Sequence, residues 1–126
     1  MLRCLIVDDS EHFLGAARRM LEREGVSVVG VASSGAQAIE RARALRPDVI
    51  LVDVDLGPES GFDVVRRLTE DAAGSAARLI LISSYPEADV AELAGASVAA
   101  GYLSKLRLSA AAIRAALERA DERPPE

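Results

Sequence analysis

The chain has 126 residues, of which 50% are hydrophobic and 28% charged, a composition typical of one folded domain. Its 15 basic and 20 acidic residues give a net charge of −5, which argues against nonspecific binding to nucleic acid or to an anionic membrane surface. The single cysteine, Cys4, excludes an internal disulfide, and no apolar run is long enough for an export signal or a membrane span. We expect a cytoplasmic protein with one domain over residues 1–120 and a polar tail at 121–126.

Five short, apolar, β-branched runs recur along the chain and predict five strands. The runs are Leu5-Ile6-Val7, Val26 to Val31, Val49 to Val52, Leu79 to Ile82 and Gly101-Tyr102-Leu103. Apolar residues at helical spacing predict a helix after each strand. These helices are expected at Phe13 to Leu21, Ala38 to Leu45, Gly61 to Leu68, Val90 to Ala94 and Arg107 to Ala120. Gly25 is placed to end the first helix and Pro86 to begin the fourth.

This alternation of strands and helices predicts the fold class. Repeated βαβ units form a parallel sheet with right-handed crossovers, and helices cover both of its faces. We therefore expect a three-layer, doubly wound α/β domain. Ligands of such domains bind beyond the carboxyl ends of the strands, so the residues that end each apolar run are the candidates for function.

Polar residues follow four of the five predicted strands. Asp8-Asp9 follow the first strand, Asp53 the third, Ser83-Ser84 the fourth and Ser104-Lys105 the fifth. Lys105 is the only lysine beside 14 arginines, and its compact ammonium suits a small site that holds a phosphoryl group. The strand ends therefore combine acids, a hydroxyl and a lysine.

If the first and third strands are neighbours, Asp8, Asp9 and Asp53 meet at one edge of the sheet. Their mutual repulsion favours a divalent cation, and Mg²⁺ binds a few carboxylates while keeping positions for water and phosphate oxygens. A carboxylate can itself attack a phosphoryl group while a lysine and a hydroxyl, here Lys105 and Ser83, stabilise the phosphoryl oxygens. The pattern indicates aspartyl phosphate chemistry.

These residues resemble those of the response-regulator receiver domains of two-component signalling, over almost the whole chain from about Leu2 to about Arg119. The resemblance pairs the family's functional residues with Asp8-Asp9 (paired acids), Asp53 (phosphoacceptor), Ser83 (switch hydroxyl), Tyr102 (switch aromatic) and Lys105 (phosphoryl contact). It implies a flavodoxin-like (βα)5 fold with strand order 2-1-3-4-5.

The resemblance also implies a metal site and a phosphodonor. Mg²⁺ would be held by Asp9, Asp53 and the backbone carbonyl of Asp55, with Asp8 reaching the ion through water. Asp53 would take its phosphate from a histidine kinase or a phosphotransfer protein. The chain is then a signalling switch rather than an enzyme with a substrate of its own.

A switched surface and a partner follow from the same resemblance. Phosphate on Asp53 would recruit the Ser83 hydroxyl and turn Tyr102 inward, so that the face built by the fourth helix, fifth strand and fifth helix changes shape. A downstream protein, or a C-terminal output domain absent from this chain, would read that face. The receiver itself would bind neither DNA nor a membrane, and the resemblance allows a homodimer.

Some positions depart from the family pattern or vary within it. Leu106 stands where many receivers have a proline, so no cis peptide is expected after Lys105, and Gly57 stands where many have a proline before Pro58. The missing proline after the lysine resembles regulators that carry a LuxR-type helix-turn-helix. Asp55 and Tyr85 would flank the phosphoryl group and tune its hydrolysis.

Each residue also has an ordinary structural explanation. Asp8 and Asp9 can cap the first helix, Asp53 can simply end a strand, Ser83 can belong to a turn, Tyr102 can be a core aromatic, and Lys105 can be a surface residue. Their joint occurrence favours the functional interpretation. His12 is expected to be solvated without a role, and Cys4 to be a buried core residue.

Two other functions remain as alternatives. Asp53-Val54-Asp55 resembles the nucleophile and acid pair of haloacid-dehalogenase-like phosphatases, although that pair usually follows the first strand of a larger, capped domain. A receiver-like interaction domain that works without phosphate is the second alternative, although such domains tend to have lost an acid or the lysine.

Overall fold

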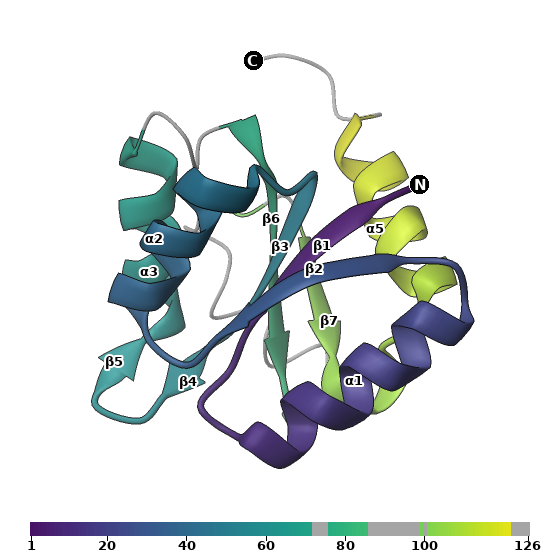
Figure 1. Ribbon diagram of the computed structural model, residues 1–126, viewed down its shortest axis with the longest axis horizontal. Helices are drawn as coiled ribbons and strands as arrows, with labels where there is room; N and C mark the ends of the chain where they lie inside the picture. Colours follow the sequence, from purple (N-terminus) through teal and green to yellow (C-terminus); the bar gives the residue numbers. More distant parts are fainter. Residues whose placement is uncertain (72–75, 86–98, 100, 122–126) are drawn as a thin grey trace.

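The structure, a computed structural model, describes residues 1–71, 76–85, 99 and 101–121. A parallel sheet forms its middle layer, with helices on both sides (Figure 1). The sheet strands are β1 (Arg3–Val7), β2 (Ser27–Ala32), β3 (Val49–Asp53), β6 (Arg78–Ser83) and β7 (Gly101–Ser104). Their order is β2-β1-β3-β6-β7, with every neighbouring pair parallel. The predicted doubly wound fold is confirmed. Because β4 and β5 lie outside this sheet, β6 and β7 are its fourth and fifth strands, and the predicted order 2-1-3-4-5 is confirmed as well.

Those two strands, β4 (Asp55–Leu56) and β5 (Glu59–Ser60), form a separate antiparallel hairpin directly after β3. The sequence analysis did not predict this hairpin. Its strands have two residues each, of which only Leu56 is apolar, so they are too short to show the apolar alternation by which a strand is recognised.

Helices α1 and α5 cover one face of the sheet, and α2 and α3 cover the other (Figure 1). Their bounds are α1 (Glu11–Arg23), α2 (Gly35–Leu45), α3 (Gly61–Glu70) and α5 (Ala110–Asp121). As predicted, α1 ends before Gly25, whose φ of 88° suits a glycine just beyond a helix end. No helix in the described ranges is long and apolar enough to cross a membrane.

The last helix begins later than Arg107, where it was predicted. Residues Lys105–Arg107 form a 3₁₀ turn, labelled η2, and α5 starts only at Ala110. The Ser109 hydroxyl accepts a hydrogen bond from the Ala112 backbone N–H, which caps the helix at this point. The peptide bond between Lys105 and Leu106 is trans, as expected.

Two predicted segments fall wholly or mostly outside the described residues. They are the fourth helix, with Pro86 at its start, and the tail after residue 121. Asp121 itself, the first residue of that predicted tail, is the last residue of α5.

Alternating side chains of β1 supply both halves of the core. Cys4 and Ile6 pack with α1 and α5, whereas Leu5 and Val7 pack with α2 and α3, and all four residues are fully buried. This double burial explains the continuous apolar runs that marked the strands in the sequence. Burial also raises the pKa of the Cys4 thiol to about 12, which suits the expected structural role.

A carboxylate at the end of α1 caps the start of α5. Glu24, the residue that follows α1, accepts a hydrogen bond from the Ala110 backbone N–H through Oε1, at 2.7 Å. The negative charge also suits the N-terminal end of the helix dipole. This bond joins the first and the last helix on the same face of the sheet.

Close packing at the start of α3 requires a glycine. A Cβ atom on Gly61 would overlap the backbone oxygen of Asp53, and the Gly61 N–H donates a hydrogen bond to the Val54 carbonyl at 2.8 Å. The first turn of α3 therefore lies directly against the end of β3.

We predict that Gly61→Ala lowers the free energy of unfolding by about 2 kcal/mol or more, because backbone atoms cannot yield as a side chain can. Urea unfolding followed by circular dichroism measures the change. Gly15→Ala is the matched control: Gly15 lies within α1, and an added Cβ would meet only the flexible end of Arg19, at 3.4 Å. It should stabilise the fold by about 0.5 kcal/mol. Equal effects of the two substitutions would contradict the proposed overlap.

Candidate functional site

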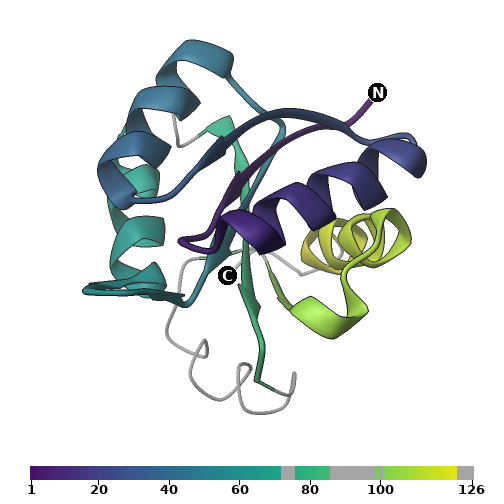
Figure 2. The same cartoon turned by 60° about the horizontal axis from the view of Figure 1, so that its bottom comes forward.

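Three carboxylates lie together at the carboxyl edge of the sheet. Pairing of β1 with β3 places Val7 opposite Val52, so Asp8 follows β1 beside Asp53 at the end of β3. One carboxylate oxygen from each of Asp8, Asp9 and Asp53 lies within 4.8 Å of the other two. Figure 2 turns this edge toward the viewer, with the start of α1 and the β4-β5 hairpin on either side of the strand ends. The predicted cluster of acids is therefore present.

The helix after the first two acids is capped by a different residue. The Ser10 hydroxyl accepts a hydrogen bond from the Phe13 N–H, and Ser10 is the N-cap of α1. Asp8 instead accepts a bond from the Ser10 N–H through Oδ1, at 2.9 Å. The alternative explanation of Asp8 and Asp9 as helix caps is wrong, because Ser10 already fills that position.

Lys105 places its ammonium between the two buried acids. Its Nζ lies 2.6 Å from Asp8 Oδ2 and 3.1 Å from Asp53 Oδ2, and its side chain is 18% exposed. Asp8 is fully buried, Asp53 is 6% exposed and Asp9 is exposed. The structure therefore brings Lys105 to the acids, as the sequence predicted, although the chain separates Lys105 from Asp53 by 52 positions.

Phe13 also belongs to this site, and the sequence analysis gave it only a place in the helix. Its ring lies under the Lys105 ammonium, with Nζ 4.4 Å from the ring centroid, a cation–π contact. Helical spacing assigned Phe13 to the core. Only the packing of α1 beside the turn after β7 shows that part of its ring faces a charge.

Burial and nearby charges have opposing effects on the pKa values of Asp53 and Lys105. Burial is the main reason that the pKa of Asp53 is raised to about 6, and the charge of Asp8 adds to it, while hydrogen bonds from Asp55 and Lys105 act against the rise. For Lys105, burial alone would lower the pKa, but Asp8 and Asp53 outweigh it and hold the pKa above its usual value. The lysine therefore stays charged at neutral pH, close to acids that its one charge cannot fully neutralise.

The chemistry of these acids suits a bound cation. Asp8 Oδ2 is buried and, among the described residues, accepts no hydrogen bond of good geometry, although it lies in ion-pair range of Lys105. Three carboxylates face a single ammonium here, which leaves an excess of negative charge. Carboxylate oxygens around an open position are the ligands that Mg²⁺ prefers.

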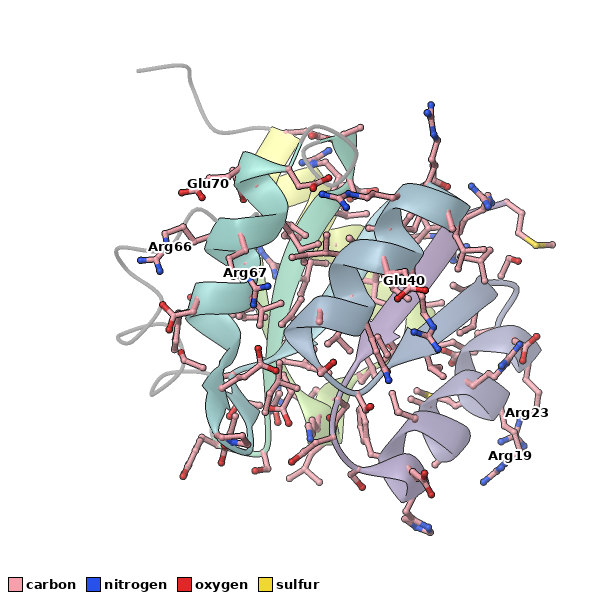
Figure 3. The ribbon with its side chains drawn as sticks, turned by 60° about the vertical axis from the view of Figure 1, so that its left-hand side comes forward. Arg19, Arg23, Glu40, Arg66, Arg67 and Glu70 are labelled. Atoms are coloured by element: carbon pink, nitrogen blue, oxygen red, sulfur yellow. The ribbon has the colours of Figure 1, made fainter. Side chains whose placement is uncertain are left out.

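The β4-β5 hairpin borders the same edge of the sheet. The Asp55 backbone N–H donates to Asp53 Oδ1 at 3.2 Å, while the Asp55 side chain is exposed. Gly57 turns the hairpin with a φ of 72° beside the carboxylate of Asp9. Glu59 fixes the hairpin to α2, because it accepts a hydrogen bond from the Gly35 N–H at 2.9 Å. It also pairs with Arg67, which is labelled on α3 in Figure 3.

The predicted hydroxyl and aromatic residues are not hydrogen-bonded to these acids in the part of the chain that the structure describes. Ser83 ends β6, next to β3, and its buried hydroxyl accepts a hydrogen bond from the Tyr85 N–H at 3.0 Å. Tyr102 lies in β7 and is half-buried against the α2 and α3 side of the core. Tyr85 is 55% exposed. No hydrogen bond or ion pair in the described ranges joins these three residues to Asp8, Asp9 or Asp53.

Comparison with known proteins assigns the class. The family model of the response regulator receiver domain matches residues 4–118. The response regulator UvrY of Escherichia coli O6:H1 is 34% identical over 106 residues, which are 83% of this chain and 48% of UvrY. A protein-glutamate methylesterase/protein-glutamine glutaminase of Alkalilimnicola ehrlichii is 44% identical over 68 residues, 53% of this chain and 17% of that protein. The chain thus spans less than half the length of either relative.

A solved structure agrees with these matches. A response regulator protein from Burkholderia pseudomallei is 32% identical, with a TM-score of 0.78 over 97% of this chain and 70% of that one. The doubly wound α/β fold, with clustered acids and a lysine at its carboxyl edge, agrees with these matches. The chain belongs to the response regulator receiver domain family. This membership favours the receiver over the dehalogenase-like phosphatase that Asp53-Val54-Asp55 also suggested.

The raised pKa of Asp53 makes a prediction about stability. Because the pKa is about 6 in the folded chain against an ordinary 3.8, the folded state binds a proton more tightly than the unfolded state. Asp53 therefore contributes stability below about pH 4 that is lost as the pH rises through 6. Relative to Asp53→Asn, which cannot ionise, the parent should lose roughly 2 kcal/mol of unfolding free energy between pH 4 and pH 7.5.

Urea unfolding in buffer free of divalent cations measures this difference. Asp55→Asn, which removes a neighbouring exposed acid, is the control and should follow the parent. A constant difference between the parent and Asp53→Asn across this pH range would show that Asp53 has an ordinary pKa.

Proposed function

We propose that this chain is a phosphoacceptor receiver, in which Asp53 takes a phosphoryl group from a histidine kinase or a phosphotransfer protein in the presence of Mg²⁺. The observation that carries the proposal is the Lys105 ammonium, held between buried Asp8 and Asp53 beside the third acid, Asp9. A structural ion pair needs one acid for one lysine. A second buried acid and an adjacent third one favour a site for a cation and a phosphoryl group.

The residues that would hold Mg²⁺ are Asp9, Asp53 and the backbone carbonyl of Asp55, with Asp8 acting through water. When bound, the ion would neutralise the phosphoryl oxygens during transfer. The buried Asp8 oxygen without a hydrogen bond and the three converging carboxylates support this assignment. The structure of the Burkholderia pseudomallei relative contains a phosphorylated aspartic acid and a calcium ion.

Asp53 supplies the nucleophile. One of its carboxylate oxygens attacks phosphorus and forms an O–P bond while the P–N bond to the donor histidine breaks, and the electron pair returns to the ring nitrogen. The Lys105 ammonium, 3.1 Å from Asp53 Oδ2, is placed to bind a phosphoryl oxygen. Ser83 uses its oxygen to accept from Tyr85, which leaves its own O–H to donate to the phosphoryl group.

Phosphate on Asp53 then changes the surface that a partner reads. Ser83 moves toward the phosphoryl group, Tyr102 turns inward, and the face formed by the fourth helix, β7 and α5 changes shape. The fourth helix lies outside the described residues, so this face rests on the family resemblance. A downstream protein or an output domain would bind this face. The longer relatives extend beyond the matched region, which leaves enough chain for such a domain.

On this proposal the chain is a signalling switch that assists its own phosphorylation and dephosphorylation and has no further substrate of its own. Its cytoplasmic location and a homodimer stay predictions. So does the expectation that the receiver itself binds neither DNA nor a membrane.

Two exposed residues flank the site and are proposed to set the lifetime of the phosphate. Asp55 follows Asp53 in the hairpin, and Tyr85 is held by its N–H to the Ser83 hydroxyl. The side chains of both are exposed, so either can place or block the water that attacks phosphorus. In that step the water oxygen bonds to phosphorus while the O–P bond to Asp53 breaks, so that inorganic phosphate leaves and the electron pair returns to the Asp53 carboxylate.

The first experiment is the intact mass of the protein after incubation with Mg²⁺ and acetyl phosphate. We expect a gain of one phosphoryl group in the parent and none in Asp53→Ala or after chelation of Mg²⁺. Asp63→Ala, which removes an exposed acid of α3, is the matched control and should behave like the parent. No gain by the folded parent would favour the alternative of an interaction domain that works without phosphate.

A second experiment follows the loss of that mass with time. We expect that changing Asp55 to Asn and Tyr85 to Ala together changes the dephosphorylation rate by about threefold or more, because both side chains border the path of water. Ser84→Ala, at the exposed residue next to Tyr85, is the control. An unchanged rate in the double variant would remove the proposed role of this pair.

A further inference from the structure

We infer that Phe13 is a positioning residue for Lys105, whose ring holds the ammonium at the phosphoryl site when the acids no longer do. The inference rests on the proposed phosphoacceptor function and adds a residue to it. The observation behind it is the cation–π contact of 4.4 Å between Lys105 Nζ and the Phe13 ring.

The ammonium has partners of two kinds. Two are carboxylates, Asp8 Oδ2 and Asp53 Oδ2, at 2.6 and 3.1 Å. The third is the face of an aromatic ring, which attracts a cation through its quadrupole but carries no charge and no lone pair. Phe13 therefore attracts the lysine without becoming a ligand of a cation or an acceptor that competes with phosphate.

That difference matters during phosphorylation. A cation among Asp8, Asp9 and Asp53 would draw on the same oxygens that now hold Lys105, and phosphorylation makes one oxygen of Asp53 the bridging oxygen of an acyl phosphate. Both changes weaken the ion pairs that fix the lysine. The ring is unaffected by either change, so it still limits the positions that a long, flexible side chain can take.

The local structure holds the ring in place. Phe13 lies in the first turn of α1, where its N–H donates a hydrogen bond to the Ser10 hydroxyl at 3.2 Å. The backbone N–H of Ser10 in turn donates a hydrogen bond to Asp8. Half-buried, the ring also packs against the α1 and α5 side of the core. The cap of α1 thereby sets the positions of both Phe13 and Asp8 relative to Lys105.

The first test reads the contact itself, without phosphate. Because Lys105 is the only lysine, labelling with ¹³C-lysine gives one set of side-chain signals. In the parent the Lys105 Hε signals should be shifted upfield by the ring current. The shift should disappear in Phe13→Leu, remain in Phe13→Tyr and remain in Met20→Ala, which truncates another half-buried residue of α1 that packs on the same core.

The second test measures the rate of phosphate uptake from acetyl phosphate with Mg²⁺. We expect Phe13→Leu to react about three- to tenfold more slowly than the parent, Phe13→Tyr to recover most of the rate, and Met20→Ala to match the parent. Thermal unfolding of each variant shows that the protein is folded. A purely structural role of Phe13 would slow Met20→Ala as much as Phe13→Leu at similar stability.

These outcomes separate the two proposals. Parental rate in Phe13→Leu, or Lys105 signals that do not depend on the ring, would overturn the role of Phe13 while the phosphoacceptor function stands. A parent that takes up no phosphate would remove the proposed function instead, and the Lys105 signals alone would then decide whether Phe13 positions the lysine.

Discussion

One lysine facing three acids is the interaction on which the site depends. The ammonium of Lys105 lies between Asp8 and Asp53, with Asp9 beside them, and burial prevents water from screening the two inner acids. Selection for stability alone would favour an apolar residue in place of Asp8 or Asp53. Here the charged residues are kept at a cost in stability, at the ends of central strands whose side chains are buried on both faces.

The sheet, and the meeting of the acids with Lys105 at its edge, could be predicted because they depend on short-range patterns. Each central strand is buried on both faces, so it appears in the sequence as an unbroken apolar run with a polar end. The parallel order then carries Asp8, Asp53, Ser83 and Lys105 to one edge whatever the loops do. Composition strengthened one of these assignments, since a lone lysine in an arginine-rich chain stands out.

Other features depend on contacts that no local pattern encodes. Ser10, rather than the acids before it, caps α1, because the choice among three adjacent capping residues is made by backbone geometry. Glu59 is 24 positions from the Gly35 amide that it binds, and the short hairpin that carries it has no apolar alternation. Phe13 looked like a core residue by spacing, and it is one, yet its ring also meets Lys105. The sequence analysis found the charged groups of the site and missed the residues that orient them.

The hydrogen bond between Glu24 and Ala110 joins residues 86 positions apart. It links a helix that is synthesised early to one that is synthesised late. While the chain is still emerging from the ribosome, α1 can form, but the face that it shares with α5 stays partly uncovered. Residues such as Leu21 then lack neighbours such as Ile113. Contacts of such long range close late, and they carry the entropy of a long loop. The domain therefore becomes a cooperative unit only when its last helix is available. The acids at the ends of β1 and β3 likewise gain a positive neighbour only once Lys105 has been synthesised.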